Sequence, residues 1–154
     1  MTQAVESAIY AELRPSTEDD LPFIIHSIVL SLHSRFPWEH VEMPTWHPEA
    51  RARVLQMLAV SRVTVACDPS DPSVIWGFCV ARERTLHWVY VKFPFRRFGL
   101  ARQLVLAACP DFGRVPHVIT SLPDTNHHHH DVAGFLKRHQ LSYNPFAGFL
   151  SKES

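Results

Sequence analysis

The sequence has few cysteines, no long hydrophobic run and no net charge. Its three cysteines, Cys67, Cys79 and Cys109, are widely spaced and odd in number, which excludes a disulfide framework and a zinc-site spacing. The longest apolar stretch, residues 23–32, contains His26 and is far shorter than the roughly 20 residues of a membrane span. Charged residues at positions 6, 12 and 14 interrupt any signal peptide. We therefore expect a soluble, cytoplasmic protein without a membrane partner.

Lys plus Arg and Asp plus Glu both number 15, and this balance argues against a nucleic-acid coat protein or a polybasic membrane binder. The charges are unevenly placed. Residues 1–50 hold eight acids against two arginines, whereas residues 82–102 hold six basic residues and one acid, Glu83. This basic centre indicates either a local anion site or a solvated charged face.

The length suits a single domain over residues 1–154, and the 46% of hydrophobic residues supply a sizeable core. Hydrophobic periodicity predicts the order β-α-α-β-β-β-α-β-α-β. The expected strands are 9–13, 63–67, 74–81, 86–91, 118–122 and 141–150, and the expected helices are 21–32, 48–60, 100–108 and 131–139. Thr17 and Asp20 resemble a capping box, Pro48 suits a first helical turn, and residues 36–47 read as a loop. The order predicts an α/β (α+β layered) fold, a mixed sheet with helices on its faces.

The segment between Trp88 and Ala101 carries the chemical signal. A strand ends at Val91, a loop with arginines and Gly99 follows, and an amphipathic helix begins at Leu100. Such a loop presents unpaired backbone N–H groups at a helix N-terminus, which suits a phosphate. Neither a Walker loop nor a dinucleotide fingerprint occurs. The pattern predicts a phosphate-bearing cofactor, with an ordinary strand–turn–helix as the alternative.

The run Arg96-Arg97-Phe98-Gly99-Leu100-Ala101 resembles the cofactor loop of the GNAT superfamily of acyl-CoA-dependent N-acyltransferases, with Val91 five residues ahead of it. The element order is also the family's, so the resemblance covers nearly the whole chain. It implies a mixed, mostly antiparallel sheet of six to seven strands flanked by about four helices. It further implies acetyl transfer from acetyl-CoA, or another acyl-CoA, to a primary amine of a small molecule, protein or peptide. Relatives commonly pair through their last strands, which implies a homodimer.

The resemblance also implies a cofactor site. Backbone N–H groups of residues 97–101 would bind the pyrophosphate, and a splay between strands 86–91 and 118–122 would admit the pantetheine arm. The arm would pair with the backbone of Val89 and Val91, and the Val91 N–H would polarise the thioester carbonyl. The implied cofactor residues are Val89, Val91, Arg96, Arg97, Phe98, Gly99, Leu100, Ala101 and His129.

Two positions depart from the family pattern. Many relatives have a glutamate base where this chain has Thr85, and a tyrosine acid where it has Leu136. Tyr143, seven residues after Leu136, remains as a candidate acid. These departures leave open a GNAT-like acyl-CoA-binding or regulatory module with lost or altered catalysis. A nucleic-acid modifier on the same fold is disfavoured by the neutral charge.

Deprotonating an alkyl amine at pH 7 costs roughly 4–5 kcal/mol, so a positioned base helps. His87 is the first candidate, and strand alternation places it on the face of Val89 and Val91, opposite Leu86. Glu83 is the second candidate. The alternative for His87 is a histidine packed in the strand, and the alternative for Glu83 is a carboxylate solvated in the turn.

The loop 36–47 lies where relatives often build the acceptor pocket, and Trp38, Glu39 and Trp46 could hold a cationic amine there. A surface loop anchored by its tryptophans is the alternative. The run His127, His128, His129 and His130 could supply a base or form a polar loop. Adjacent residues rarely converge on one ion, so we expect no functional metal.

Overall fold

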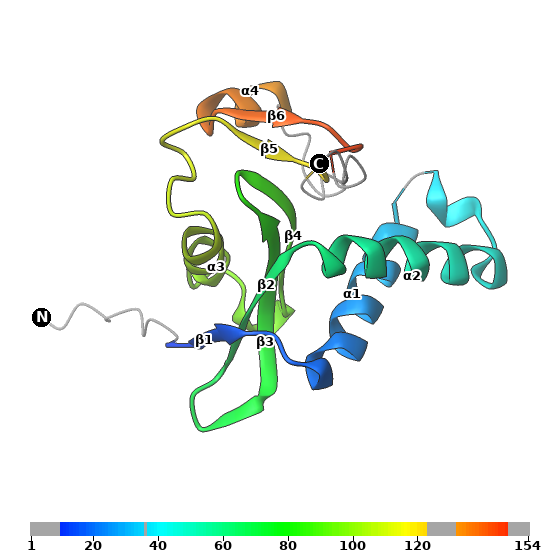
Figure 1. The fold of residues 1–154 in the computed structure, drawn as a ribbon, viewed down its shortest axis with the longest axis horizontal. Coiled ribbons are helices and arrows are strands. Elements are labelled where there is room, and N and C mark those ends of the chain that lie inside the picture. The colour runs from blue at the N-terminus through cyan, green and yellow to red at the C-terminus, as the bar shows by residue number, and fades with distance from the viewer. Residues whose placement is uncertain (1–9, 36, 123–131, 148–154) are drawn as a thin grey trace, which may run out of the picture.

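The computed structural model describes residues 10–35, 37–122 and 132–147. Apart from short 3₁₀ turns, its elements follow the predicted order (Figure 1). The strands are β1 (Glu12–Pro15), β2 (Arg62–Asp68), β3 (Asp71–Arg82), β4 (Thr85–Val91), β5 (His117–Ile119) and β6 (Leu141–Tyr143). The helices are α1 (Leu21–His33), α2 (Met43–Ala59), α3 (Leu100–Ala108) and α4 (Val132–Arg138).

These strands form one sheet in the order β1-β2-β3-β4-β5-β6. Strands β1 to β4 are antiparallel neighbours, whereas β5 runs parallel to β4 and β6 runs parallel to β5. Parallel neighbours need a crossover, and α3 and α4 provide the two crossovers. The α/β fold with a mixed, mostly antiparallel sheet is confirmed.

Helices α1 and α2 lie on one side of the sheet and α3 on the other (Figure 1), and each side has its own core. Helices α1 and α2 pack on one face through the apolar stripe of α1, formed by Ile24, Ile25, Ile28 and Val29. Helix α3 packs on the other face through Leu100 and Leu104. None of the helices in the described ranges has the length and apolar character that crossing a bilayer requires.

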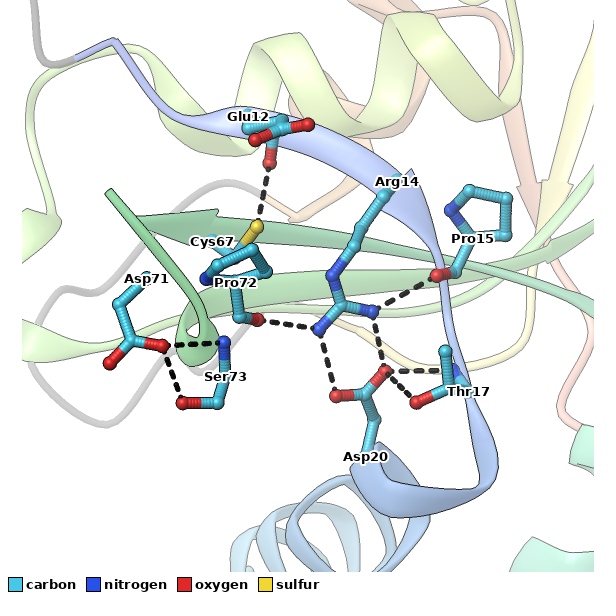
Figure 2. A network of polar contacts seen from close by, with 9 residues as sticks. All are labelled: Glu12, Arg14, Pro15, Thr17, Asp20, Cys67, Asp71, Pro72 and Ser73. Atoms are coloured by element: carbon cyan, nitrogen blue, oxygen red, sulfur yellow. Dashed lines mark hydrogen bonds and ion pairs between the residues drawn. The ribbon is translucent and has the colours of Figure 1, made fainter. Parts of the chain in front are cut away.

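A buried ion pair joins β1 to the start of α1 and to the β2–β3 hairpin (Figure 2). Arg14 donates to both carboxylate oxygens of Asp20, at 2.7 and 3.0 Å, and to the Pro72 carbonyl at 2.8 Å. The Thr17 N–H donates to Asp20 at 2.7 Å, which confirms the capping box. The hydrogen bonds from Arg14 lower the pKa of Asp20 below 3.8, so the carboxylate stays ionised.

Helix α2 begins at Met43, five residues before the predicted start at Pro48. Trp46 stabilises the additional turn, because its indole N–H donates to the Val29 carbonyl at 3.2 Å on α1. Pro44 occupies the first turn, whereas Pro48 lies inside the helix and lacks the N–H that would donate to the Pro44 carbonyl, so the prediction of Pro48 in the first turn is wrong. Residues 43–47 are therefore helical, not part of a loop.

Strand boundaries also differ from the prediction. β1 lies at Glu12–Pro15 instead of 9–13, β5 ends at Ile119 instead of 122, and β6 ends at Tyr143. After β6 the chain turns, and the Ala147 N–H donates to the Asn144 carbonyl at 3.2 Å. Predicted positions 9, 131 and 148–150, and the histidine run 127–130, lie outside the described residues.

Candidate functional site

A β-bulge in β4 shapes the centre of the sheet. Two consecutive β3 residues pair with Trp88 and Leu86, so His87 is an extra residue between them. The bulge interrupts the alternation of side chains, and Leu86 packs into the α3-side core together with Val89. The expectation that Leu86 faces away from Val89 is therefore wrong.

Strands β4 and β5 separate directly after this bulge. Their ladder consists of the pairs Thr85–Val118 and Leu86–Ile119, and β4 continues to Val91 beyond it. The predicted splay between these strands is present in the structure. We call the point of separation the fork.

Two hydroxyl groups hold His87 at the fork. Ser121 Oγ donates to the His87 carbonyl at 2.8 Å, and Thr120 Oγ1 lies 3.0 Å from Nδ1 of the ring. His87 is 3% exposed. Burial, and secondarily the charge of Arg82, lower its pKa below 6.5. The ring is therefore neutral at pH 7. In the tautomer whose Nδ1–H donates to Thr120 Oγ1, Nε2 is the unprotonated nitrogen.

The backbone of β4 beyond the fork presents polar groups to the gap. The Lys92 N–H donates to the Trp76 carbonyl of β3 at 2.8 Å. Because an antiparallel ladder alternates, the N–H groups of Val89 and Val91 point the other way, toward the side that β5 has left. The Val91 carbonyl on that side accepts a 2.8 Å bond from Arg96 Nε.

A cleft of about 1200 Å³ opens at this gap. Its lining comes from both faces of the sheet: residues 31–35 at the end of α1, strand β4, helix α3, the loop 110–114 and helix α4. The ionised side chains among the described lining residues are the arginines Arg35, Arg96, Arg102 and Arg114. Arg35 donates to the Leu122 carbonyl at 2.8 Å and lies 4.9 Å from the Trp88 ring centroid. The cleft therefore carries a positive potential suited to an anionic ligand.

The loop between β4 and α3 contains two left-handed residues, Arg97 (φ 72°) and Gly99 (φ 78°). Gly99 is the N-cap of α3, and a Cβ added there would meet no atom within 4 Å. The positive φ therefore explains the glycine, not lack of space. Leu100, 1% exposed, fixes the first helical turn in the core. The N–H groups of that turn lack intrahelical acceptors, as an anion site requires.

No family model and no curated protein matches the sequence. Several solved structures, in contrast, resemble this chain in fold. A protein from Clostridium difficile 630, described as a possible acetyltransferase, has a TM-score of 0.50 at 17% identity over 88% of this chain and 95% of its own. A protein from Desulfovibrio desulfuricans described as of the GNAT family has 0.40 at 19% identity, over 64% of this chain and 62% of its own. A Salmonella typhimurium protein, solved with its cofactor acetyl-CoA, has a TM-score of 0.41 at 17% identity, over 65% of this chain and 61% of its own.

The chain has the GNAT fold. At these identities the likeness concerns the fold, and the match spans less than two thirds of the Desulfovibrio and Salmonella chains.

Several residues expected at the GNAT cofactor site come together. Val89, Val91, Arg96 and Ala101 line the cleft, and Arg97, Phe98 and Gly99 are exposed in the intervening loop. Leu100 is buried in the α3-side core. His129 lies outside the described residues.

The other candidate acid and base residues lie apart from the described cleft lining. Glu83 is exposed in the β3–β4 turn, with φ 51°. Tyr143 is 44% exposed on β6, where it pairs with Ile119. His87 is therefore the predicted acid–base residue that the structure places in the cleft.

The expected acceptor residues form a separate aromatic cluster. The rings of Trp38 and Trp46 lie 5.4 Å apart, and His33 lies 5.6 Å from Trp46. Trp46 packs against the α1–α2 core, and Glu39 is exposed next to Trp38 in the turn Trp38–His40. These three predicted residues are not among the described residues of the cleft lining.

Sequence reasoning missed Arg35, Thr120 and Ser121, which the fold brings to the fork or the cleft. The position of each depends on a contact with a residue far away in the sequence, and no local motif identifies these residues. Within residues 10–35, 37–122 and 132–147, no group of three or more His, Cys, Asp or Glu side chains could hold a metal ion.

Proposed function

We propose that this protein is an acyl-CoA-dependent N-acyltransferase that transfers an acetyl group from acetyl-CoA to a primary amine by direct attack. The observation that carries the proposal is the gap beyond the fork, where the N–H groups of Val89 and Val91 face the cleft. The same cleft reaches Arg96 and Ala101, at the two ends of the predicted pyrophosphate loop. The GNAT fold supports the proposal.

In this proposal the loop N–H groups of residues 97–101 bind the pyrophosphate, and Arg96 and Arg102 add positive charge. Arg96 also fixes the end of β4 through its bond to the Val91 carbonyl. The pantetheine arm lies in the gap in place of a strand. The Val91 N–H then donates to the thioester oxygen and stabilises the negative charge that develops there.

The reaction needs a neutral amine next to the thioester carbon. His87 is neutral in the fold, and its Nε2 accepts the amine proton directly or through a water molecule. The new N–C bond forms, the C–S bond breaks, and the thiolate of coenzyme A takes the proton that His87 removed. Thr120 keeps the ring in place by its contact with Nδ1.

A second candidate is a GNAT-fold module that binds acyl-CoA without transferring the acyl group. Thr85 and Leu136 favour it, since they replace the glutamate and tyrosine of many relatives. The two candidates share the cofactor cleft and differ in turnover. Release of free coenzyme A with a panel of amines, peptides and aminoglycosides separates them, and binding without turnover on any acceptor favours the module.

Calorimetric titration with acetyl-CoA tests the cofactor site. We expect saturable binding, which the double variant Arg96→Ala, Gly99→Trp abolishes because it removes the charge and fills the approach to the amides. Arg51→Ala, at an exposed position of α2, is the matched control and should bind like the parent. No heat at millimolar acetyl-CoA would contradict the proposal. A salt-dependent mobility shift of DNA or RNA would instead revive the nucleic-acid reading.

A further inference from the structure

Part of the cleft is apolar and extends beyond what an acetyl group needs. Six side chains line this part, and all are partly exposed: Leu86, Val105, Leu106, Phe112, Phe135 and Leu141. They come from β4, α3, the loop after α3, α4 and β6. We call this region the apolar lobe.

The apolar lobe lies on the far side of the fork from the pyrophosphate loop. The second half of α3 leads toward the β3–β4 turn: Leu104, at the middle of the helix, approaches Gly77 opposite Val91, whereas Cys109, after the helix end, contacts the Glu83 carbonyl at 3.6 Å. Val105 and Leu106 are therefore displaced from Arg96 toward the paired part of β4 and β5. Leu86 belongs to the lobe and forms the last β4–β5 pair, so the lobe begins at the fork.

The chemistry of the lobe suits an aliphatic chain. The cleft, about 1200 Å³ in all, holds the lobe together with the part beside Val89, Val91 and Arg96. His139 packs between Phe112 and Phe135, with ring centroids 6.3 and 4.8 Å away, and builds a continuous wall. Apolar side chains that are partly exposed in the free protein become covered when a chain fills the space.

We infer that the apolar lobe binds the aliphatic chain of a medium-length acyl-CoA, from butyryl to octanoyl, and that such a thioester is preferred over acetyl-CoA. The inference rests on the proposed function, since the thioester must first reach the fork. It concerns the acyl donor and leaves the amine acceptor as proposed above.

The test is calorimetric titration of the full chain with coenzyme A and with its acetyl, butyryl, hexanoyl and octanoyl thioesters. Each buried methylene should tighten binding about three- to fourfold. Even with partial burial, octanoyl-CoA should bind roughly thirtyfold more tightly than acetyl-CoA. Equal or falling affinity along the series overturns the inference while leaving the proposed function standing. Absence of binding for every member, coenzyme A included, overturns both.

A variant tests whether the gain in affinity with chain length arises in the lobe. Leu106→Trp should fill the space and remove the advantage of octanoyl-CoA over acetyl-CoA. Ala107→Trp, on the exposed face of the same helix, is the matched control and should keep the chain-length trend. An unchanged trend in Leu106→Trp overturns the assignment to this lobe. If Leu106→Trp does not fold, the series on the parent protein still decides whether chain length matters.

Discussion

Nδ1 of His87 lies 3.0 Å from Oγ1 of Thr120, at the residue where β4 and β5 stop pairing. Because His87 is an extra residue in β4, its ring meets the end of β5. The same bulge precedes Val89 and Val91, whose N–H groups face the gap. One local irregularity therefore brings together a neutral imidazole, two backbone donors and the opening of the cleft.

Replacement of His87 by glutamine should lower the rate of acetyl transfer about 10²- to 10⁴-fold, because the base is lost, while acetyl-CoA affinity is retained. Thr120→Val should lower the rate about tenfold or more, since the ring loses its contact at Nδ1, whereas Thr120→Ser keeps the hydroxyl and the rate. Coenzyme A release and calorimetry measure the two quantities. Parental turnover in His87→Gln would assign the proton transfer to another group.

His87 should also make stability depend on pH. Its folded pKa is lower than the unfolded value near 6.5, so the unfolded chain binds the proton first as the pH falls. This contribution to stability is complete above 6.5 and decreases as the pH falls toward the folded pKa. Urea unfolding at about pH 7.5 and about pH 5.5 should show a smaller loss in His87→Gln than in the parent. Equal losses would indicate that the pKa of His87 is the same in the folded and unfolded states.

Gly77 is required by close packing against β4. A Cβ at this position would lie 2.5 Å from the Tyr90 carbonyl oxygen and 3.2 Å from Val91 Cα. Gly77→Ala should therefore destabilise the fold by about 1–3 kcal/mol or more and weaken acetyl-CoA binding. In Gly113→Ala, where φ is +84° and the space is open, only backbone strain of about 1 kcal/mol is expected. Urea unfolding should rank the two, and the reverse ranking would contradict the packing argument.

Asp20→Asn should destabilise the fold by about 2–3 kcal/mol, because it leaves the Arg14 guanidinium beside a neutral amide in a largely buried site. Asp19→Asn, at the exposed neighbouring position, should have little effect. Acid titration gives a second measurement. The folded pKa of Asp20 is below 3.8, so its contribution is present above that value and is lost as the pH falls through the folded pKa. Equal acid-unfolding midpoints for Asp20→Asn and Asp19→Asn would show that the ion pair does not stabilise the fold.

The elements with strong local signals could be predicted from the sequence. The apolar stripe of α1 and the Gly99-to-Leu100 start of α3 gave boundaries that the structure confirms almost to the residue. The early start of α2 could not be predicted, because it depends on the bond between Trp46 and Val29. In each correct case the determining interactions lie within a few residues.

The candidate site was predictable only in part for the same reason. The Arg96–Ala101 loop is a local pattern, and it lies at the cleft as expected. The bulge at His87 is set by register against β3, and His87 is held by the hydroxyls of Thr120 and Ser121, which lie 33 and 34 residues later in the chain. An apolar strand sequence such as that of residues 85–91 shows neither feature.

The most direct test of the account is a crystal structure of the protein soaked with coenzyme A. We predict the diphosphate on the N–H groups of residues 97–101, and the pantetheine arm in the gap beside Val89 and Val91. A diphosphate bound elsewhere, or a gap closed by side chains in crystals with coenzyme A bound, would contradict it.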